Sequence, residues 1–147
     1  MRVPQTPREF AIAYGWSFIG QWYKWGGDDP SGFDCSGFQI EILKAVGVLP
    51  RRFDCTAADL FNKFKKFTVR EPYPGCLVFW ENRRTGKIVH VEIMVTKNCS
   101  LGASGGGSKT LTVQDAIKHN AFIKVRDIHT RTGIFGFVDP FKDVVWS

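Results

Sequence analysis

The sequence changes character at residues 72–75, where Pro72, Pro74 and Gly75 interrupt it. Before this break the apolar residues recur at helical spacing, and after it they alternate or run together as they do in strands. Proline and glycine interrupt regular structure, so no helix or strand is expected to cross the break. A chain with helices first and strands afterwards is typical of an α+β fold, with N-terminal helices packed on an antiparallel sheet.

Three helices are predicted before the break, and the first two are each preceded by a residue that can cap the first turn. Thr6 and Asp34 are these capping residues, and the third helix is expected to begin near Thr56. The first helix is expected to end near Gly20 and the second near Gly47, while the third carries the apolar residues of LFNKF inward. Residues 22–33, WYKWGGDDPSGF, are expected to form a loop with tight turns.

The second half is predicted to be strands joined by turns. CLVFWE and KIVHVEIMVT, at residues 76–81 and 87–96, are expected to form a hairpin through NRRTGK. LGASGGGSKT, at residues 101–110, is predicted to be a glycine-rich turn, and TLTVQDAI, AFIKVRDI and GIFGFVDPF are predicted to add short strands and turns. No linker or repeat interrupts the chain, so residues 1–147 are expected to form a single domain.

Charge and hydropathy limit the partners that the chain can have. Its net charge of +6 predicts a surface that attracts polyanions. The basic residues are scattered and are not expected to interleave with exposed aromatic residues on one element, which argues against nucleic-acid binding. No apolar stretch approaches the roughly 20 residues of a membrane span, and the N-terminus lacks the pattern of a signal peptide. The chain is therefore expected to be made in a cytoplasm.

Two of the four cysteines lie in identical FDC triplets, within SGFDCSGF and RRFDCTAA. Cys35 falls at the first turn of a predicted helix, where free backbone N–H groups and the helix dipole favour a thiolate. The small residues that follow Cys35 leave its sulfur open to a substrate. We therefore predict that Cys35 is a nucleophile and that Cys55, Cys76 and Cys99 pack as small apolar residues. The cysteine spacing excludes common zinc motifs, and no metal or cofactor is expected.

A cysteine nucleophile requires a base, and the chain has three histidines. His90 lies in a strand-like run and shares a face with Ile88 and Glu92. His119 and His129 fall in polar, turn-like segments and are expected to be exposed. His90 is therefore the predicted base.

YKWGGDDPSGFDCSGF, PGCLVFW and HVEIMV, in this order across residues 20–104, resemble the NlpC-type cell-wall peptidases, a branch of the papain-like cysteine peptidases. The resemblance implies a cysteine nucleophile at the N-terminus of a helix packed on an antiparallel sheet. It also implies hydrolysis of peptide bonds in peptidoglycan stems, often next to D-γ-glutamyl and diamino-acid residues. It assigns Cys35 as nucleophile, His90 as general base and Tyr23 as an oxyanion donor beside the backbone N–H of Cys35. Tyr23 could instead be a core aromatic residue.

The chain departs from the family pattern at three positions. Cys76 stands where the family has an aspartate, and Glu92 stands where it has a glycine. The polar residue that orients the histidine in the family, about twelve residues after it, falls at or near Gly102 here. Glu92, Ser104 or a backbone carbonyl are the candidates to fix the imidazole tautomer instead.

The missing polar residue leaves alternatives to a peptidase. One is a wall-binding domain that has lost its chemistry, and another is an acyltransferase or amidase of the same papain-like group. Peptidoglycan stem peptides are the expected substrate. A chain without a signal peptide is expected to reach the wall as a component of a phage tail or lysis system, or to recycle wall peptides in a bacterial cytoplasm.

Overall fold

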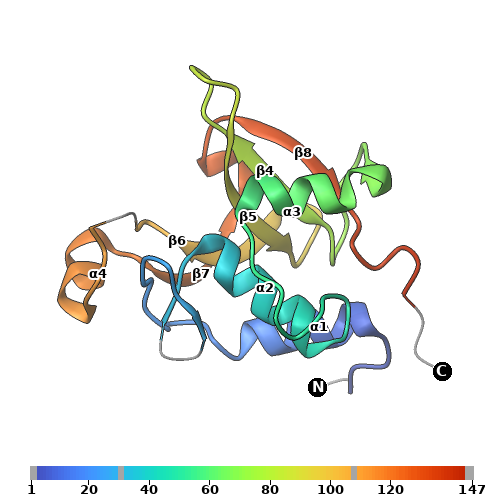
Figure 1. Ribbon diagram of the computed structural model, residues 1–147, viewed down its shortest axis with the longest axis horizontal. Helices are drawn as coiled ribbons and strands as arrows, with labels where there is room; N and C mark the ends of the chain where they lie inside the picture. The colour runs from blue at the N-terminus through green and yellow to red at the C-terminus, as the bar shows by residue number, and fades with distance from the viewer. Residues whose placement is uncertain (1–2, 30–31, 107–108, 145–147) are drawn as a thin grey trace.

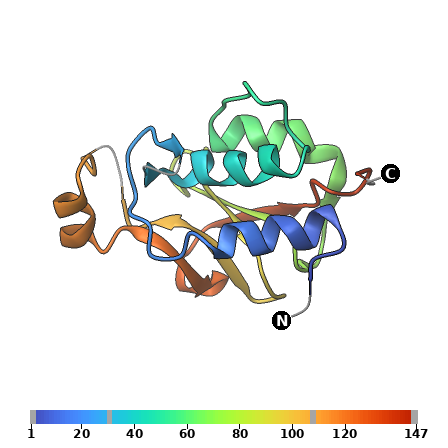
Figure 2. The same cartoon turned by 90° about the horizontal axis from the view of Figure 1, so that it is seen from below.

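The computed structural model describes residues 3–29, 32–106 and 109–144. Helices and an antiparallel sheet form two layers, with α1, α2 and α3 on one face of the sheet (Figures 1 and 2). The helices are α1 (Pro7–Trp16), α2 (Cys35–Ala45), α3 (Ala57–Phe64) and α4 (Val113–His119). This architecture confirms the predicted α+β class.

The main sheet has the strand order β3-β8-β4-β5-β6-β7, and each neighbouring pair is antiparallel. Its strands are β3 (Thr68–Val69), β4 (Leu77–Glu81), β5 (Ile88–Met94), β6 (Cys99–Ser104), β7 (Phe122–Asp127) and β8 (Ile134–Val138). The predicted hairpin of β4 and β5 is confirmed. In the predicted loop before α2, β1 (Asp28–Asp29) and β2 (Gly32–Phe33) form a short antiparallel pair, and residues 30–31 lie outside the described residues.

The two predicted N-caps are confirmed, and Thr56 also caps its helix. The side chains of Thr6, Asp34 and Thr56 each accept a hydrogen bond from the backbone N–H three residues later, at 3.1, 2.7 and 3.2 Å. Helix α1 ends four residues before the predicted Gly20. The Ser17 hydroxyl donates to the carbonyl oxygen of Tyr14 at 2.6 Å, and the chain leaves the helix there through a series of turns.

Two predictions for the second half are wrong. The first four residues of the segment predicted as a glycine-rich turn, 101–104, belong to β6, which pairs with β5 and β7 inside the sheet. Its small residues leave room for neighbouring side chains, as described below for Gly102. The segment expected to add a strand before β7 contains helix α4, which begins with a capping box between Thr112 and Asp115.

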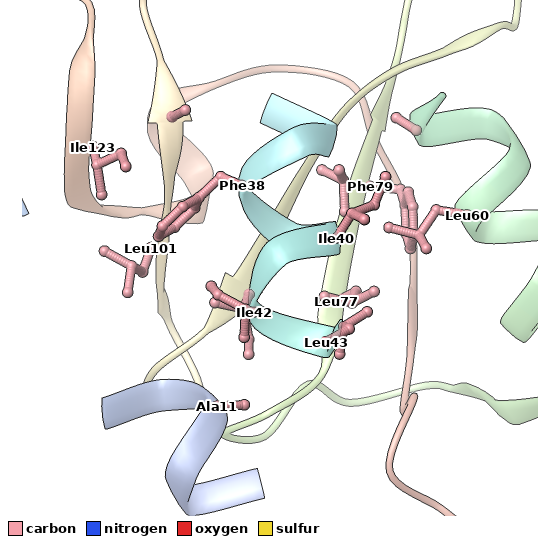
Figure 3. Close-up of a cluster of buried hydrophobic side chains, with 14 of the residues drawn as sticks. Ala11, Phe38, Ile40, Ile42, Leu43, Leu60, Leu77, Phe79, Leu101 and Ile123 are labelled. Carbon is pink, nitrogen blue, oxygen red and sulfur yellow. The ribbon is translucent and has the colours of Figure 1, made fainter. Parts of the chain in front are cut away.

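Helix α2 is fixed by the main core (Figure 3). Its residues Phe38, Ile42 and Leu43 are fully buried and face Phe79 of β4 and Leu101 of β6. Burying each such side chain contributes about 1.5–3 kcal/mol. The first residue of α2 is therefore held at a fixed place above β5.

The opposite face of the sheet carries a second buried cluster. It contains Cys76, Val78, Trp80, Met94 and Ile128. Cys76 is a packing residue, as predicted. Among the described residues, no helix combines the length and apolar composition that crossing a bilayer requires.

Candidate active site

The N-terminus of α2 places Cys35 at its first position, directly after the cap Asp34. One carboxylate oxygen of Asp34 accepts from the Gly37 N–H at 2.7 Å, and the other accepts from the Gly26 N–H at 3.1 Å. The same side chain thus joins the helix to the preceding glycine loop. A Cβ at Gly37 would lie 2.0 Å from the carbonyl oxygen of Gly27, so the loop packs directly on the helix backbone.

A cleft of about 560 Å³ opens at this helix end. Its lining includes the three predicted site residues, Cys35, His90 and Tyr23. They come from α2, from β5 and from the loop after α1, so the fold brings together residues that lie far apart in the sequence. The cleft is also lined by Cys55, which was predicted to be only a packing residue, and by Arg131, which the motifs did not indicate.

Cys35 is partly exposed as a residue, and its sulfur lies 4.0 Å from the carbonyl oxygen of Val89. Desolvation, followed by the charge of Asp34, raises the pKa of Cys35 to about 11, although hydrogen bonding to the backbone of Val91 and Ser36 acts in the opposite direction. The resting residue is therefore a thiol at neutral pH. The prediction of a resting thiolate is therefore wrong. Burial and the charge of Asp34 raise the pKa of the thiol more than the electrostatic field of the helix N-terminus lowers it.

His90 is buried in β5, and its Nε2 atom lies 2.5 Å from Oε2 of Glu92. Burial lowers the pKa of His90, while Glu92 acts to raise it. The imidazole is therefore neutral at neutral pH. Because an ionised carboxylate only accepts hydrogen bonds, Nε2 carries the proton and Nδ1 keeps its lone pair.

Glu92 is buried and holds two further contacts. Its Oε1 accepts from the Ser100 hydroxyl at 2.7 Å, and its Oε2 lies 3.5 Å from the Arg126 guanidinium. His90, Ser100 and Arg126 together lower the pKa of Glu92 despite its burial. Among the described residues, Glu92 is the candidate that contacts the imidazole.

Tyr23 is buried, and its pKa is raised, first by desolvation and then by Cys35 and Asp34. Its phenol therefore stays protonated and can donate a hydrogen bond. The Ser104 hydroxyl also lines the cleft, and within the described part of the chain it has no hydrogen-bond partner. In that part, no cluster of three or more His, Cys, Asp or Glu side chains could hold a metal ion.

Comparison with known proteins places this arrangement in a family. CwlT, a bifunctional muramidase/DL-endopeptidase of Bacillus subtilis strain 168, is 39% identical over 93 residues, which are 61% of this chain and 27% of that protein. A gamma-D-glutamyl-L-lysine dipeptidyl-peptidase of the same organism is 33% identical over 122 residues, which are 80% of this chain and 40% of that protein. This chain thus spans less than half the length of either relative.

A solved structure of the same family has a similar fold. The crystal structure of the NlpC/p60 domain of the peptidoglycan hydrolase SagA superposes with a TM-score of 0.66 and 25% sequence identity, covering 89% of this chain and 97% of that one. The sequence model of the NlpC/P60 family matches residues 20–127, which include all of the predicted site residues. This chain belongs to the NlpC/P60 family.

Proposed function

We propose that this chain is a cysteine endopeptidase that hydrolyses amide bonds in peptidoglycan stem peptides. The observation that carries the proposal is that a cysteine at a helix N-terminus, a neutral buried histidine and a protonated tyrosine line the same cleft. Relatives that are named as a DL-endopeptidase and a dipeptidyl-peptidase support the reaction class.

The reaction proceeds through a thioester. Nδ1 of His90 takes the proton of the Cys35 thiol as the sulfur attacks the substrate carbonyl carbon. The backbone N–H of Cys35 and the Tyr23 hydroxyl donate to the oxyanion, and one such donor is worth about 2.7–4 kcal/mol. His90 then protonates the leaving amine, and a water molecule that His90 deprotonates releases the acyl group.

The charges of the cleft suit a peptide that carries both a carboxylate and an amine. Among its lining residues, Asp34 and Asp59 are engaged in capping helices. Arg131 and Asp54 also line it, and in the described chain neither makes a hydrogen bond or ion pair through its side chain. The name of one relative specifies γ-D-glutamyl-L-lysine, and such a peptide has one free glutamyl carboxylate and one lysine ammonium group.

Mass spectrometry of the peptides released from purified peptidoglycan tests the proposal. The wild type should release stem-peptide fragments, Cys35→Ala should release none, and Cys55→Ala should retain activity within a few-fold. Cys55 is a matched control because it lines the same cleft. Equal losses in both variants would contradict the assignment, and wall binding without any release would favour a domain that has lost its chemistry.

A further inference from the structure

Glu92 and Gly102 occupy facing positions on neighbouring strands. Strands β5 and β6 pair antiparallel, with Ile93 opposite Leu101 and Met94 opposite Ser100. Continuing this register by one residue places Glu92 opposite Gly102. A Cβ at Gly102 would lie 2.4 Å from Cγ and 2.8 Å from Cδ of Glu92. The Glu92 side chain therefore occupies the space that any side chain at position 102 would need.

The Glu92 carboxylate in this space contacts three polar side chains. Ser100 donates to one oxygen, while His90 and Arg126 face the other. A buried charge costs several kcal/mol unless it is paired and hydrogen-bonded, and these three groups satisfy that requirement. The side chain therefore has one defined orientation, with Oε2 toward the histidine ring.

We infer that Glu92 is the positioning residue of His90, and that Gly102 is required because it leaves room for the Glu92 side chain. The contact with Nε2 fixes the ring orientation and the tautomer, so that Nδ1 is the nitrogen available to Cys35. The two positions have exchanged roles relative to the motif that the chain resembles: a glycine stands where the polar residue is expected, and a carboxylate stands where the glycine is expected. The reaction that Glu92 serves rests on the proposed function, but the tautomer of His90 does not.

Glu92→Gln tests the role of the charge, since the amide keeps the shape of the side chain and removes its charge. Loss of the correctly oriented tautomer should lower kcat by about 10²–10⁴-fold. Because Glu92 acts to raise the pKa of His90, the acidic limb of the kcat/KM profile should also move to lower pH. A merely structural role would leave that limb in place.

Asp139→Asn is the matched control. Asp139, directly after β8, is also buried and also binds an arginine and a hydroxyl, Arg8 at 2.9 Å and Tyr73 at 2.6 Å, but it does not line the cleft. Neutralising it should leave the pH profile unchanged and kcat within a few-fold. If both variants lose the same activity without a shift of the limb, the positioning role is wrong.

The double variant Glu92→Gly with Gly102→Glu tests the exchange. Glu92→Gly alone should lose activity as Glu92→Gln does. The double variant, with its added carboxylate at position 102, should be at least tenfold more active than Glu92→Gly. A double variant that folds by circular dichroism and is no more active than Glu92→Gly would overturn the exchange.

Nitrogen-15 NMR of the histidine rings gives a readout that needs no activity. In the wild type, His90 should be a neutral imidazole with its proton on Nε2, and Glu92→Gln should weaken that preference. A wild-type His90 protonated on Nδ1 would overturn the inference, even if the chain proves to be a peptidase. A confirmed tautomer in a protein that does not hydrolyse stem peptides would contradict only the proposed function.

Discussion

At Cys35 and His90, burial favours the neutral form of both residues. Desolvation raises the pKa of the thiol and lowers the pKa of the imidazole, so both changes oppose a standing thiolate–imidazolium pair. In the proposed mechanism, proton transfer from the thiol would accompany attack on the substrate. On that mechanism, proton transfer depends more on the orientation of the imidazole than on the electrostatic field at the helix N-terminus.

Arg131 should discriminate between substrates by their charge. Arg131→Gln is expected to lower kcat/KM by about 10–100-fold on a stem peptide with a free D-glutamyl α-carboxylate, since a hydrogen bond to a charged group contributes about 1.5–3 kcal/mol. On the same peptide with that carboxylate amidated, the variant and the wild type should differ little. Steady-state kinetics on the two synthetic peptides gives the comparison.

Asp54→Asn is the control for this experiment. It should leave unchanged the ratio of kcat/KM between the peptide with the free glutamyl carboxylate and the amidated peptide. If Arg131→Gln lowered kcat/KM equally on both peptides, Arg131 would instead stabilise negative charge on the Cys35 sulfur or on the oxyanion. Such a role is compatible with the electrostatic interaction between Arg131 and Cys35.

The sequence predicted that Cys35, His90 and Tyr23 belong together, because each lies in a recognisable motif. Cys55 was not predicted to line the cleft, since its local sequence says nothing about which surface α3 presents to α2. Glu92 was only one of three candidates, because the strand rise alone separates it from His90 by about 6–7 Å. Gly102 could have indicated Glu92, because a glycine inside a strand often marks the close approach of a neighbouring group.

At the scale of elements, the site depends on the contact between α2 and the loop before it. Gly37→Ala would place a Cβ 2.0 Å from the carbonyl oxygen of Gly27 and 2.8 Å from the Asp34 carboxylate. Such overpacking typically costs about 1–3 kcal/mol, and it would also displace Cys35. We expect a lower free energy of unfolding in urea and reduced activity.

Gly136→Ala is the control for this variant, since a Cβ there meets no heavy atom within 4 Å and the backbone lies outside the left-handed region. Its free energy of unfolding should stay within about 0.5 kcal/mol of the wild type. If Gly37→Ala proved as stable as this control, the loop could not be packed as the structure has it.

The helices before the break were predictable because their caps and apolar spacing are local signals. Strand β6 was not predicted, because glycine, alanine and serine are weak strand formers. At Gly102 the small size is required by the Glu92 side chain of the neighbouring strand β5. Helix α4 was missed although Thr112 and Asp115 form a capping box, a local signal that its β-branched neighbours obscured.

At the scale of the whole molecule, the strand order creates the cleft. The C-terminal strand β8 inserts between β3 and β4, while β5 lies under the N-terminus of α2 and β6 lies beside it (Figure 1). This order depends on pairing between distant parts of the chain, so spacing in the sequence could not predict it. The sequence predicted the class of the fold and the motifs, and the topology determined which residues meet.

The most direct test of the central claim is covalent trapping with a stem-peptide analogue that carries a halomethyl ketone at the scissile carbonyl. Peptide mapping by mass spectrometry should find the adduct on Cys35, and His90→Ala should slow its formation by at least tenfold at neutral pH. Labelling of Cys55 in place of Cys35, or an unchanged rate without His90, would contradict the claim that Cys35 attacks the substrate with His90 as its base.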